Sequence, residues 1–416
     1  MKRFVFILAI TALLNITYSN GAPKSAKKRV TTSATSVELS KTLPGWSEGC
    51  LDIHFINSAR GECCFYILPD GTTLLVDAGE YEGGESNTPQ RPNSNTPPYI
   101  TYANYIKHFL PKGKRAIDYC APSHFHTDHI GSTGTVIGTA PAGYRKSGLL
   151  ALYDEVPYNH ILDRAYPNYT EDEVTPALSG QLAEDWATFV RWGVKNDIFT
   201  AERFVAGKEQ IVMVNKPRKY SDFSIFNICA NGFIFNRTNS GVDKVVGKVA
   251  KSGGNPASCG FHIRYGAFDY IACGDLTSSV QNRLAYYFRD FVGVGNLDAF
   301  KSNHHLAANS WGTRMQECNF NPRVVLNHCF TLNKPDVNKL LHVLPVVKAF
   351  FSTNIHKDFA TLPGVKENKL LEKMTAYNGH IVLRVMPGGG EFYVYMLDDS
   401  DFEYRVKSIH GPYKSK

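Results

Sequence analysis

Four potential metal ligands lie within six positions of one short segment. Residues 120–132 read Cys-Ala-Pro-Ser-His-Phe-His-Thr-Asp-His-Ile-Gly-Ser and come at the end of an apolar, strand-like run. In extended backbone His124 and His126 point to the same side, because side chains alternate with period two. Asp128 and His129 follow where the chain turns toward a helix, so they can face a second metal ion. Imidazole and carboxylate together suit zinc, manganese or iron. The spacing H-x-H-x-D-H therefore predicts a metal site at a strand end.

From residue 50 onward, short strand-like runs alternate with helical patterns. Period-two alternation predicts the strands, and apolar residues every three to four positions predict the helices. The strands come in two batches, each mixed with helices. We therefore expect an α/β fold in which two sheets pack face to face between outer helices, a four-layer αββα sandwich. Strands are expected at 51–56, 63–68, 72–78, 117–121, 223–229, 258–265, 268–273, 297–302, 323–327, 347–352, 381–386 and 392–397, and helices at 97–110, 181–192, 279–291 and 337–343.

One domain is expected over residues 50–400, with a helical insertion at residues 140–220. The insertion is longer than a simple connection between two elements. It could be a lid or a partner surface, or an ordinary helical elaboration.

Both ends of the chain are expected to lie outside this domain. Residues 1–22 have a positive start, a short apolar run and small residues, which predicts a secretory signal peptide. The run Phe4–Leu14 is too short for a bilayer core, which needs about 20 residues. We expect a secreted or periplasmic protein with no integral membrane association after cleavage. Residues 23–49 predict a flexible leader that is basic and Ser/Thr-rich, and residues 401–416 a tail.

The formal net charge of +7 hints at an anionic partner, but most of it precedes the domain. Six of the 45 Lys and Arg residues come before residue 31, and the remaining 39 face 38 acidic residues. The folded part is nearly neutral, so its charge is no sign of a broad nucleic-acid-binding surface.

The nine cysteines do not form a C-x-x-C pair, which argues against a thiolate zinc site. Several lie inside apolar runs and are expected to be buried free thiols. These are Cys64, Cys120, Cys229, Cys259 and Cys273.

The order of motifs along the chain resembles the metallo-β-lactamase superfamily. The signature of that superfamily, H-x-H-x-D-H after a strand, is matched at residues 124–129. An early aspartate at a strand end is matched by Asp77, and a later aspartate that bridges the metal ions by Asp275. A late histidine after a strand is matched by the pair His304-His305.

The closer resemblance is to the hydrolase-like domain of ComEC-type DNA-uptake proteins and their free-standing secreted relatives. Residues 51–79 look like the opening of that domain, and residues 324–353 look like its closing strand-helix-strand. Most superfamily members have a histidine before the strand that leads to the bridging aspartate. Here Asn255 takes that place, which resembles the ComEC-type subgroup and weakens the ligand set of the first metal ion.

The resemblance implies two divalent metal ions, with zinc favoured and manganese an alternative. The first ion would be held by His124 and His126, completed by Asn255 or water. The second ion would be held by Asp128, His129 and one of His304 or His305, a choice that the strand register leaves open. Asp275 would bridge the two ions.

The remaining site residues act on water or substrate. Asp128 and Asp77 are the candidate catalytic residues, with Asp77 expected to orient a histidine or the attacking water. Asn255, Ser258, Asn303 and Ser310 are the candidate substrate-binding residues. His262 and His328 are weaker candidates for the site.

Three functions fit these observations. The first is a secreted hydrolase that cleaves a phosphodiester through a metal-activated water, with nucleic acid or a small molecule as substrate. The second is a lactone, thioester or β-lactam hydrolase. The third is a binding or uptake module with low turnover.

Overall fold

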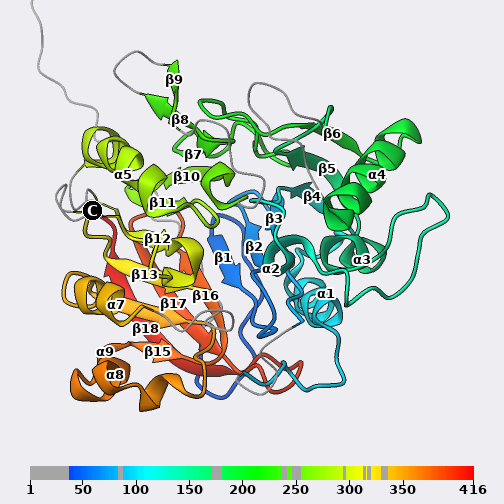
Figure 1. Ribbon diagram of the computed structural model, residues 1–416. Helices are drawn as coiled ribbons and strands as arrows, with labels where there is room; N and C mark the ends of the chain where they lie inside the picture. Colours follow the sequence, from blue (N-terminus) through cyan, green and yellow to red (C-terminus); the bar gives the residue numbers. More distant parts are fainter. Residues whose placement is uncertain are drawn as a thin grey trace, which may run out of the picture. The chain divides into compact units, whose positions relative to one another are not determined.

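Two mixed β-sheets form the centre of the unit Val37–Lys416 (Figure 1). The structure is a computed structural model that describes residues 37–82, 88–169, 180–236, 241–245, 254–293, 297–312, 315, 320–328 and 336–416. The expected signal segment at residues 1–22 lies outside the described residues.

The first sheet has the strand order β18-β17-β16-β1-β2-β3-β4-β5-β6. Its N-terminal and C-terminal strands are neighbours, because β1 pairs antiparallel with β16 through the register Leu51↔Val385. From β3 to β6 the neighbouring strands are parallel. The bounds are β1 Leu51–Phe55, β2 Cys64–Ile67, β3 Thr73–Val76, β4 Ile117–Cys120, β5 Tyr158–Asp163, β6 Thr200–Arg203, β16 His380–Val385, β17 Glu391–Leu397 and β18 Val406–Lys414.

The second sheet has the strand order β15-β14-β13-β12-β11-β10-β7-β8-β9. Strands β11 to β15 run parallel to one another, and β7 to β11 form antiparallel pairs. The bounds are β7 Phe223–Ala230, β8 Phe233–Asn236, β9 Gly241–Lys244, β10 Gly260–Tyr265, β11 Phe268–Ala272, β12 Ala299–Lys301, β13 Val324–Asn327, β14 Ala349–Ser352 and β15 Ala376–Tyr377.

Helices cover the outer face of each sheet (Figure 1). Helix α1 begins with Pro98 at its first turn, where the missing N–H costs nothing, and buries Tyr102, Ile106 and Phe109 on one face. The helices are α1 Pro98–Phe109, α2 Thr127–Ile130, α3 Gly148–Glu155, α4 Gln181–Lys195, α5 Ser278–Tyr287, α7 Val337–Val343, α8 Pro363–Glu367 and α9 Leu370–Lys373. Shorter turns are η1 Asn255–Ala257, η2 Phe288–Gly293, η3 Asn303–Leu306 and η4 Phe359–Thr361.

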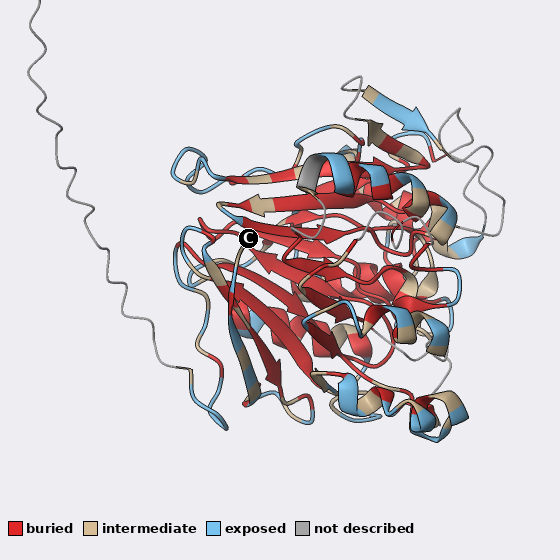
Figure 2. Cartoon of the chain, turned by 90° about the vertical axis from the view of Figure 1, so that its left-hand side faces the viewer, coloured by how far each residue is buried: buried red, intermediate tan, exposed pale blue. Residues whose placement is uncertain are grey.

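Period-two alternation sorts the apolar side chains into three layers. Tyr66 and Tyr270 lie in the core between the two sheets, where their hydroxyl groups meet at 3.2 Å. Phe65 faces the layer under α1, and Ile271 faces the layer under α5. Figure 2 shows buried residues along the strands of both sheets. The observed fold is the expected α/β sandwich of four layers.

The predicted strands are all present, with bounds that differ from the expectation by two residues at most. The five cysteines expected to be buried free thiols are buried and unpaired, as predicted.

The expected boundaries of the domain were too narrow at both ends. Of the predicted leader at residues 23–49, residues 37–49 belong to the folded unit: Leu43 is buried, and Thr42 bridges to Arg405. Of the predicted tail at residues 401–416, β18 forms an edge strand beside β17. Its charged residues and Pro412 suit an edge position. They also interrupt the apolar alternation that predicts a strand.

The segment at residues 140–220 is not only helical, as expected. It contributes β5 and β6 to the first sheet as well as α3 and α4. The register pair Cys120↔Ile161 places the end of β5 beside the end of β4. The segment therefore brings the residues that follow β5 to the same sheet edge as the predicted metal-binding motif, which follows β4.

Candidate metal centre

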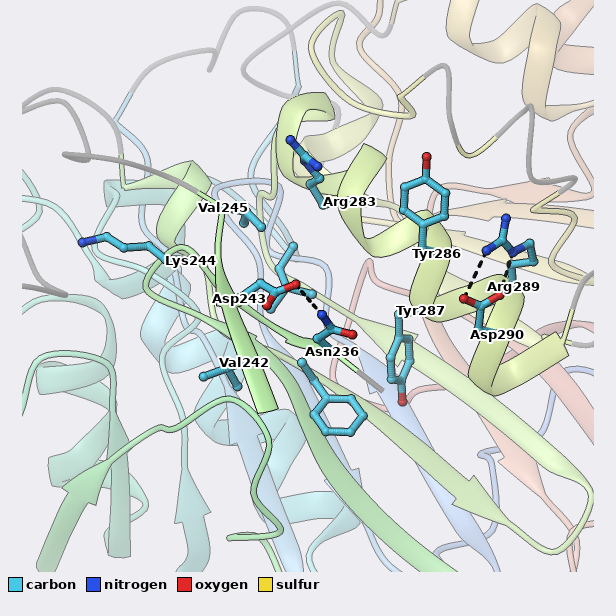
Figure 3. A pocket seen from close by; sticks show the side chains of 12 residues that line it. Asn236, Val242, Asp243, Lys244, Val245, Arg283, Tyr286, Tyr287, Arg289 and Asp290 are labelled. Carbon is cyan, nitrogen blue, oxygen red and sulfur yellow. Dashed lines mark hydrogen bonds and ion pairs between the residues drawn. The ribbon is translucent and has the colours of Figure 1, made fainter. Parts of the chain in front are cut away.

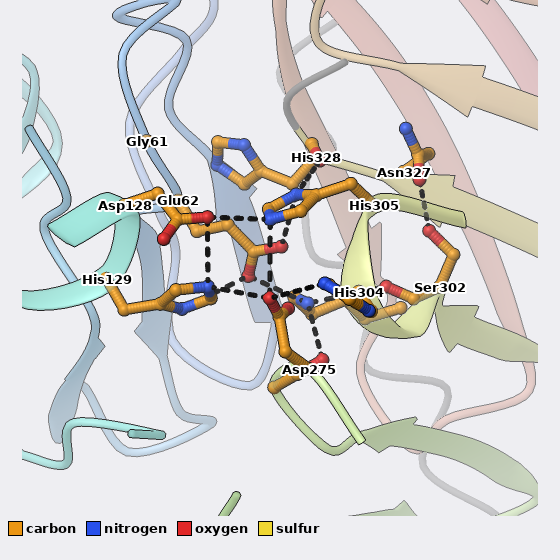
Figure 4. Close-up of polar contacts among 12 residues, drawn as sticks. Gly61, Glu62, Asp128, His129, Asp275, Ser302, His304, His305, Asn327 and His328 are labelled. Atoms are coloured by element: carbon orange, nitrogen blue, oxygen red, sulfur yellow. Dashed lines mark hydrogen bonds and ion pairs between the residues drawn. The ribbon is translucent and has the colours of Figure 1, made fainter. Parts of the chain in front are cut away.

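The candidate ligands come from segments that follow five strands. Figure 4 shows Asp128, His129, Asp275, His304 and His305 gathered around Glu62. Parallel neighbours release their chains at the same edge of a sheet, so β3 with β4, and β11 with β12, deliver their following residues side by side. The histidine motif follows β4 and enters α2. Asp77 follows β3, Asp275 follows β11, His304 and His305 lie in η3 after β12, and Glu62 lies between β1 and β2.

His129 is fully buried and held from both sides of its ring. Its Nδ1 faces Asp77 Oδ2 at 2.8 Å, and its Nε2 lies 3.2 Å from Asp275 Oδ2 and 3.6 Å from Asp128 Oδ2. A carboxylate on Nδ1 fixes the tautomer that leaves the Nε2 lone pair for a metal ion. Burial alone would lower the pKa of His129, but the carboxylates of Asp275, Asp128 and Asp77 outweigh it and raise the pKa well above its usual range.

His305 is held in the same way from the opposite sheet. Its Nδ1 donates to the backbone carbonyl of His328 (2.8 Å), which can only accept, so Nε2 is again the free ligand atom. That Nε2 lies 2.9 Å from Asp128 Oδ2 and 3.4 Å from Asp275 Oδ2. Burial would lower the pKa of His305, yet the negative charge of Asp275 and its neighbours raises it strongly. Surroundings that hold a proton on Nε2 also favour a cation there.

Asp275 is the shared carboxylate of the site. Its Oδ2 lies within 3.9 Å of the Nε2 atoms of four histidines, His124, His129, His304 and His305. Burial would raise the pKa of Asp275, but the positive His129 and His305 overcome this and bring the pKa well below the usual value. The backbone N–H of Asp275 donates to Oγ of Ser258 (3.1 Å), a predicted substrate-binding residue, so Ser258 lies directly against the shared carboxylate's backbone.

Glu62 belongs to the site, although sequence reasoning did not select it. It is buried and forms a metal-type cluster with His129, Asp275 and His305. Its carboxylate lies on the Nδ1 side of both rings, 3.9 Å from His129 and 3.2 Å from His305. Lys301, also buried, places its Nζ 2.7 Å from Glu62 Oε2. Glu62 therefore places a negative charge beside both rings, and Lys301 lies against that charge.

Asp77 reaches the site through a strained backbone. Its φ is +64°, a left-handed conformation that is uncommon for a residue with a side chain. The conformation lets Oδ1 accept from the Ser123 backbone N–H, and Oδ2 accept from Ser123 Oγ, both at 2.7 Å. Asp77 therefore fixes the start of the motif as well as the His129 ring.

The two leading histidines of the motif differ in their surroundings. Their rings lie beside each other, with centroids 4.6 Å apart. His124 is fully buried; its Nδ1 bonds Ser123 Oγ (3.1 Å), and its Nε2 is 3.9 Å from Asp275 Oδ2. His126 is less buried, and its Nε2 accepts from the Gly254 backbone N–H (3.3 Å). The structure thus turns His124 toward the shared carboxylate, and turns the Nε2 of His126 toward Gly254.

The structure brings in both members of the double histidine. His304 Nε2 lies 3.9 Å from Asp275 and 3.1 Å from Asn255 Nδ2, whereas His305 faces Asp128 and Glu62. The chain achieves this with three consecutive left-handed residues, His304, His305 and Leu306, whose φ values are +48°, +51° and +61°. Strain of this kind, in residues that are not glycine, gathers at functional sites.

The donor set fits divalent metal ions. His124 Nε2, His129 Nε2 and Asp275 Oδ1 are buried and have no hydrogen-bond partner. Leaving such atoms unpaired costs about 1 to 3 kcal/mol each. Imidazole and carboxylate ligands suit zinc, manganese or iron. A cation among these atoms would supply the partner that each of them lacks.

The remaining candidates are spread more widely. Asn255 contacts His304, and its Oδ1 is buried without a partner. Asn303 is buried in η3, with its Oδ1 likewise unpartnered. Ser310 donates to the Ala307 carbonyl (2.6 Å) within its own turn, so its hydroxyl is engaged locally.

Two weaker histidine candidates serve the fold. His262 lies in β10, where its Nε2 is 2.6 Å from Asp269 and its Nδ1 is 3.1 Å from the Tyr287 hydroxyl. His328 accepts from the Cys63 backbone N–H (3.1 Å) and supplies the carbonyl that orients His305.

A separate pocket of about 710 Å³ lies between β8, β9 and α5 (Figure 3). Four of its polar side chains form two pairs, because Asn236 donates to Asp243 (2.6 Å) and Arg289 pairs with Asp290 (2.6 Å). None of the residues proposed for the metal centre lines this pocket.

Comparisons with known proteins give distant structural likenesses. No protein-family model and no curated protein sequence matches the chain. Among solved structures, the chain is similar to CmlA, a diiron beta-hydroxylase from Streptomyces venezuelae, with 13% identity, a TM-score of 0.38, and coverage of 82% of this chain and 55% of CmlA. It therefore spans about half of that protein.

Two further structures are similar over shorter or comparable lengths. Zn(2+)-bound PqqB from Methylobacterium extorquens matches with 11% identity and a TM-score of 0.36, over 78% of this chain and 87% of PqqB. A metallo-β-lactamase from Cronobacter sakazakii matches with 11% identity and a TM-score of 0.26, over 57% of this chain and 64% of that enzyme.

Proposed function

We propose that the chain is a metal-dependent hydrolase that directs a water molecule against a phosphodiester bond. The proposal depends on one observation: the buried Nε2 atoms of His124 and His129 have no hydrogen-bond partner and lie 3.9 and 3.2 Å from the carboxylate of Asp275, whose Oδ1 is also unpartnered. Each buried polar atom without a partner lowers the stability of the fold, so these atoms are better explained by a bound ligand than by a structural role.

The residues divide into two groups around Asp275. Asp128 lies near both His129 and His305, so we assign these three residues to one group. We assign His124 and His304, which also approach Asp275, to the other. His126 lies next to His124 and would complete the second group. Divalent ions held there, with zinc favoured over manganese, would lower the pKa of water toward neutrality and offset negative charge on the reacting oxygens.

The chain's own residues would position the reaction. Asp77 holds His129 in one tautomer, and the backbone carbonyl of His328 holds His305 in the same way. Asp128 is the carboxylate that faces both rings from α2, and it retains slight exposure. We assign Asp128 to accept a hydrogen bond from the attacking water.

The choice of a phosphodiester is supported by the resemblance to ComEC-type domains. The alternatives are a lactone, thioester or β-lactam substrate, or a binding module with low turnover. Export is proposed from residues 1–22 alone. Within the described parts of the chain, no helix is long and apolar enough to cross a membrane.

Metal analysis and hydrolysis assays test the proposal together. We expect the purified protein to bind zinc or manganese and to cleave at least one member of a substrate panel. The panel contains bis-p-nitrophenyl phosphate, single-stranded DNA, a lactone and a cephalosporin. Asp128→Ala should lower the rate on the preferred substrate by at least about 100-fold.

Asp185→Asn is a matched control. Asp185 is also a buried aspartate, but it lies in α4 and pairs with Arg145 at 2.9 Å, so its amide should leave activity unchanged. Equal rates for wild type and Asp128→Ala on every substrate would end the catalytic proposal. A protein that binds neither metal would also rule out the alternative hydrolases.

A further inference from the structure

A buried arginine lies beside the candidate metal centre. Arg164 directly follows β5, whose end lies next to the end of β4, so the chain delivers it to the edge from which the histidine motif emerges. Only 2% of its surface is exposed. Its guanidinium is thus a fixed positive charge at the rim of the site.

The orientation of this side chain is set by two contacts. The Nε of Arg164 donates to Asn231 Oδ1 (3.1 Å), and Asn231 Nδ2 donates back to the Arg164 carbonyl (2.7 Å). The guanidinium carbon lies 5.3 Å from the centre of the Phe125 ring, a cation–π distance. Phe125 is the residue between the two leading histidines of the motif, so the guanidinium is tied to the motif itself.

The terminal nitrogens of Arg164 have no partner in the described residues. Among the described residues, no carboxylate lies within ion-pair distance of Nη1 or Nη2, and neither nitrogen donates a hydrogen bond. The neighbouring Asp163 is engaged elsewhere, since it accepts from the Trp186 indole (2.8 Å), the Ala165 backbone N–H (2.8 Å) and the Tyr169 hydroxyl. Desolvation by burial lowers the pKa of the Arg164 guanidinium and outweighs the negative charge of Asp163, which acts to raise that pKa, so the buried cation is incompletely compensated.

Gly254 shows how close this charge is to the metal ligands. A Cβ built on Gly254 would lie 3.6 Å from Arg164 Nη1, 3.2 Å from His124 Cδ2 and 3.5 Å from His126 Nε2. The guanidinium and both histidines therefore surround the same point of backbone. An anionic group held by Arg164 would be within reach of the side of the centre formed by His124.

We propose that Arg164 binds an anionic oxygen group of the substrate and places it beside the metal centre. This assignment rests on the proposed hydrolase function and narrows its substrate class to anions. A guanidinium offers two parallel N–H donors that match the two free oxygens of a phosphodiester, which a lysine ammonium cannot reproduce. Arg164 is thus a specificity-determining residue that sequence reasoning did not select.

The first test measures anion binding without catalysis. Metal-free protein, prepared with a chelator, is titrated calorimetrically with dimethyl phosphate, inorganic phosphate and acetate. We expect Arg164→Met to weaken phosphate binding by about 10- to 100-fold, the effect of losing charged hydrogen bonds. Arg164→Lys should retain part of the affinity, and it keeps the test valid if the methionine variant does not fold. Preference for acetate over both phosphates would identify a carboxylate as the anion.

Arg191→Met is the matched control. Arg191 also lies over an aromatic ring, Tyr169, at 5.0 Å and donates to a backbone carbonyl, but it is exposed on α4. Its loss should leave anion binding unchanged. If phosphate binds equally well to wild type and to both Arg164 variants, or weakens as much in Arg191→Met, the assignment is wrong.

The second test separates binding from turnover in the metal-loaded enzyme. For bis-p-nitrophenyl phosphate, Arg164→Met should raise KM by at least about 10-fold, with a smaller change in kcat. For the neutral ester p-nitrophenyl acetate, KM should not change. Equal effects on both substrates would refute a role in anion recognition. If wild type hydrolyses nothing, yet its phosphate binding is lost in Arg164→Met, the hydrolase proposal fails and the anion site stands.

Discussion

The pair Glu62–Lys301 should be one of the strongest single electrostatic contributions to the stability of this fold. The two charged groups lie 2.7 Å apart, with side chains 1% and 3% exposed. Coulomb attraction at that distance and an effective dielectric of about 20 is roughly 6 kcal/mol, before the cost of desolvation. Removing one partner leaves the other as an uncompensated buried charge, which typically costs about 3 to 5 kcal/mol.

A double-mutant cycle measures this coupling. We expect Lys301→Met to lower the free energy of unfolding by about 3 to 5 kcal/mol in metal-free protein, followed by guanidinium chloride denaturation. The double variant Glu62→Gln/Lys301→Met should lose at least about 2 kcal/mol less than the sum of the single variants, because it buries no lone charge.

The surface pair Lys107–Glu155 provides the control. Its atoms are equally close, at 2.6 Å, but its side chains are 47% and 35% exposed. Solvent screening should limit its coupling to about 1 kcal/mol or less in the same cycle. If the buried pair couples no more strongly than this surface pair, the reasoning about burial is refuted.

Three further predictions concern pH, metal affinity and packing. Burial lowers the pKa of His54 to about 4 and of His380 to about 3, against 6.5 when exposed. The unfolded chain therefore takes up protons first as the pH falls, and each histidine should cost about 2 kcal/mol of stability between pH 7 and pH 5. Urea denaturation of His54→Gln should show a shallower pH dependence, and an unchanged slope would contradict this. Asp77→Asn, which keeps the shape but removes the charge, should weaken metal binding by about 10- to 100-fold in a competition titration with a chelating dye; wild-type affinity would show that Asp77 does not support the centre. A Cβ on Gly79 would lie 1.9 Å from the Asp128 carbonyl oxygen, so Gly79→Ala should displace α2 and lower both stability and metal affinity, and a variant that matches wild type in both would be inconsistent with this packing.

The sandwich could be predicted from the sequence because its strands are buried on one or both faces. The run at 51–56 alternates cleanly and became β1, and the final hairpin around residues 387–390 became β16 and β17. β18 could not be predicted, since an edge strand tolerates the lysines, glycine and proline that obscure alternation. Leu43 falls within the predicted leader, because a short segment with one large apolar residue shows no period that would predict a strand or helix.

In the candidate site, too, residues with a local sequence pattern could be predicted and residues without one could not. The spacing of the motif predicts its ligands. Positions directly after strands predict Asp275 and the double histidine. Glu62, Lys301 and Arg164 carry no local signal, because a charged residue in a loop or strand end is usually solvated. Their importance comes from burial and from partners distant in sequence, such as the 239 positions that separate Glu62 from Lys301. Only the assembled fold provides that information.

The sharing of Asp275 among four imidazoles makes the centre unequally tolerant of change. Each histidine places its Nε2 within 3.9 Å of Asp275 Oδ2, so the loss of one leaves three such contacts in place. This is consistent with an asparagine at position 255, which leaves four imidazoles and the carboxylates of Asp275 and Asp128 nearby. Substitution of a single histidine should therefore disturb the centre less than substitution of Asp275, the one carboxylate that all four imidazoles share.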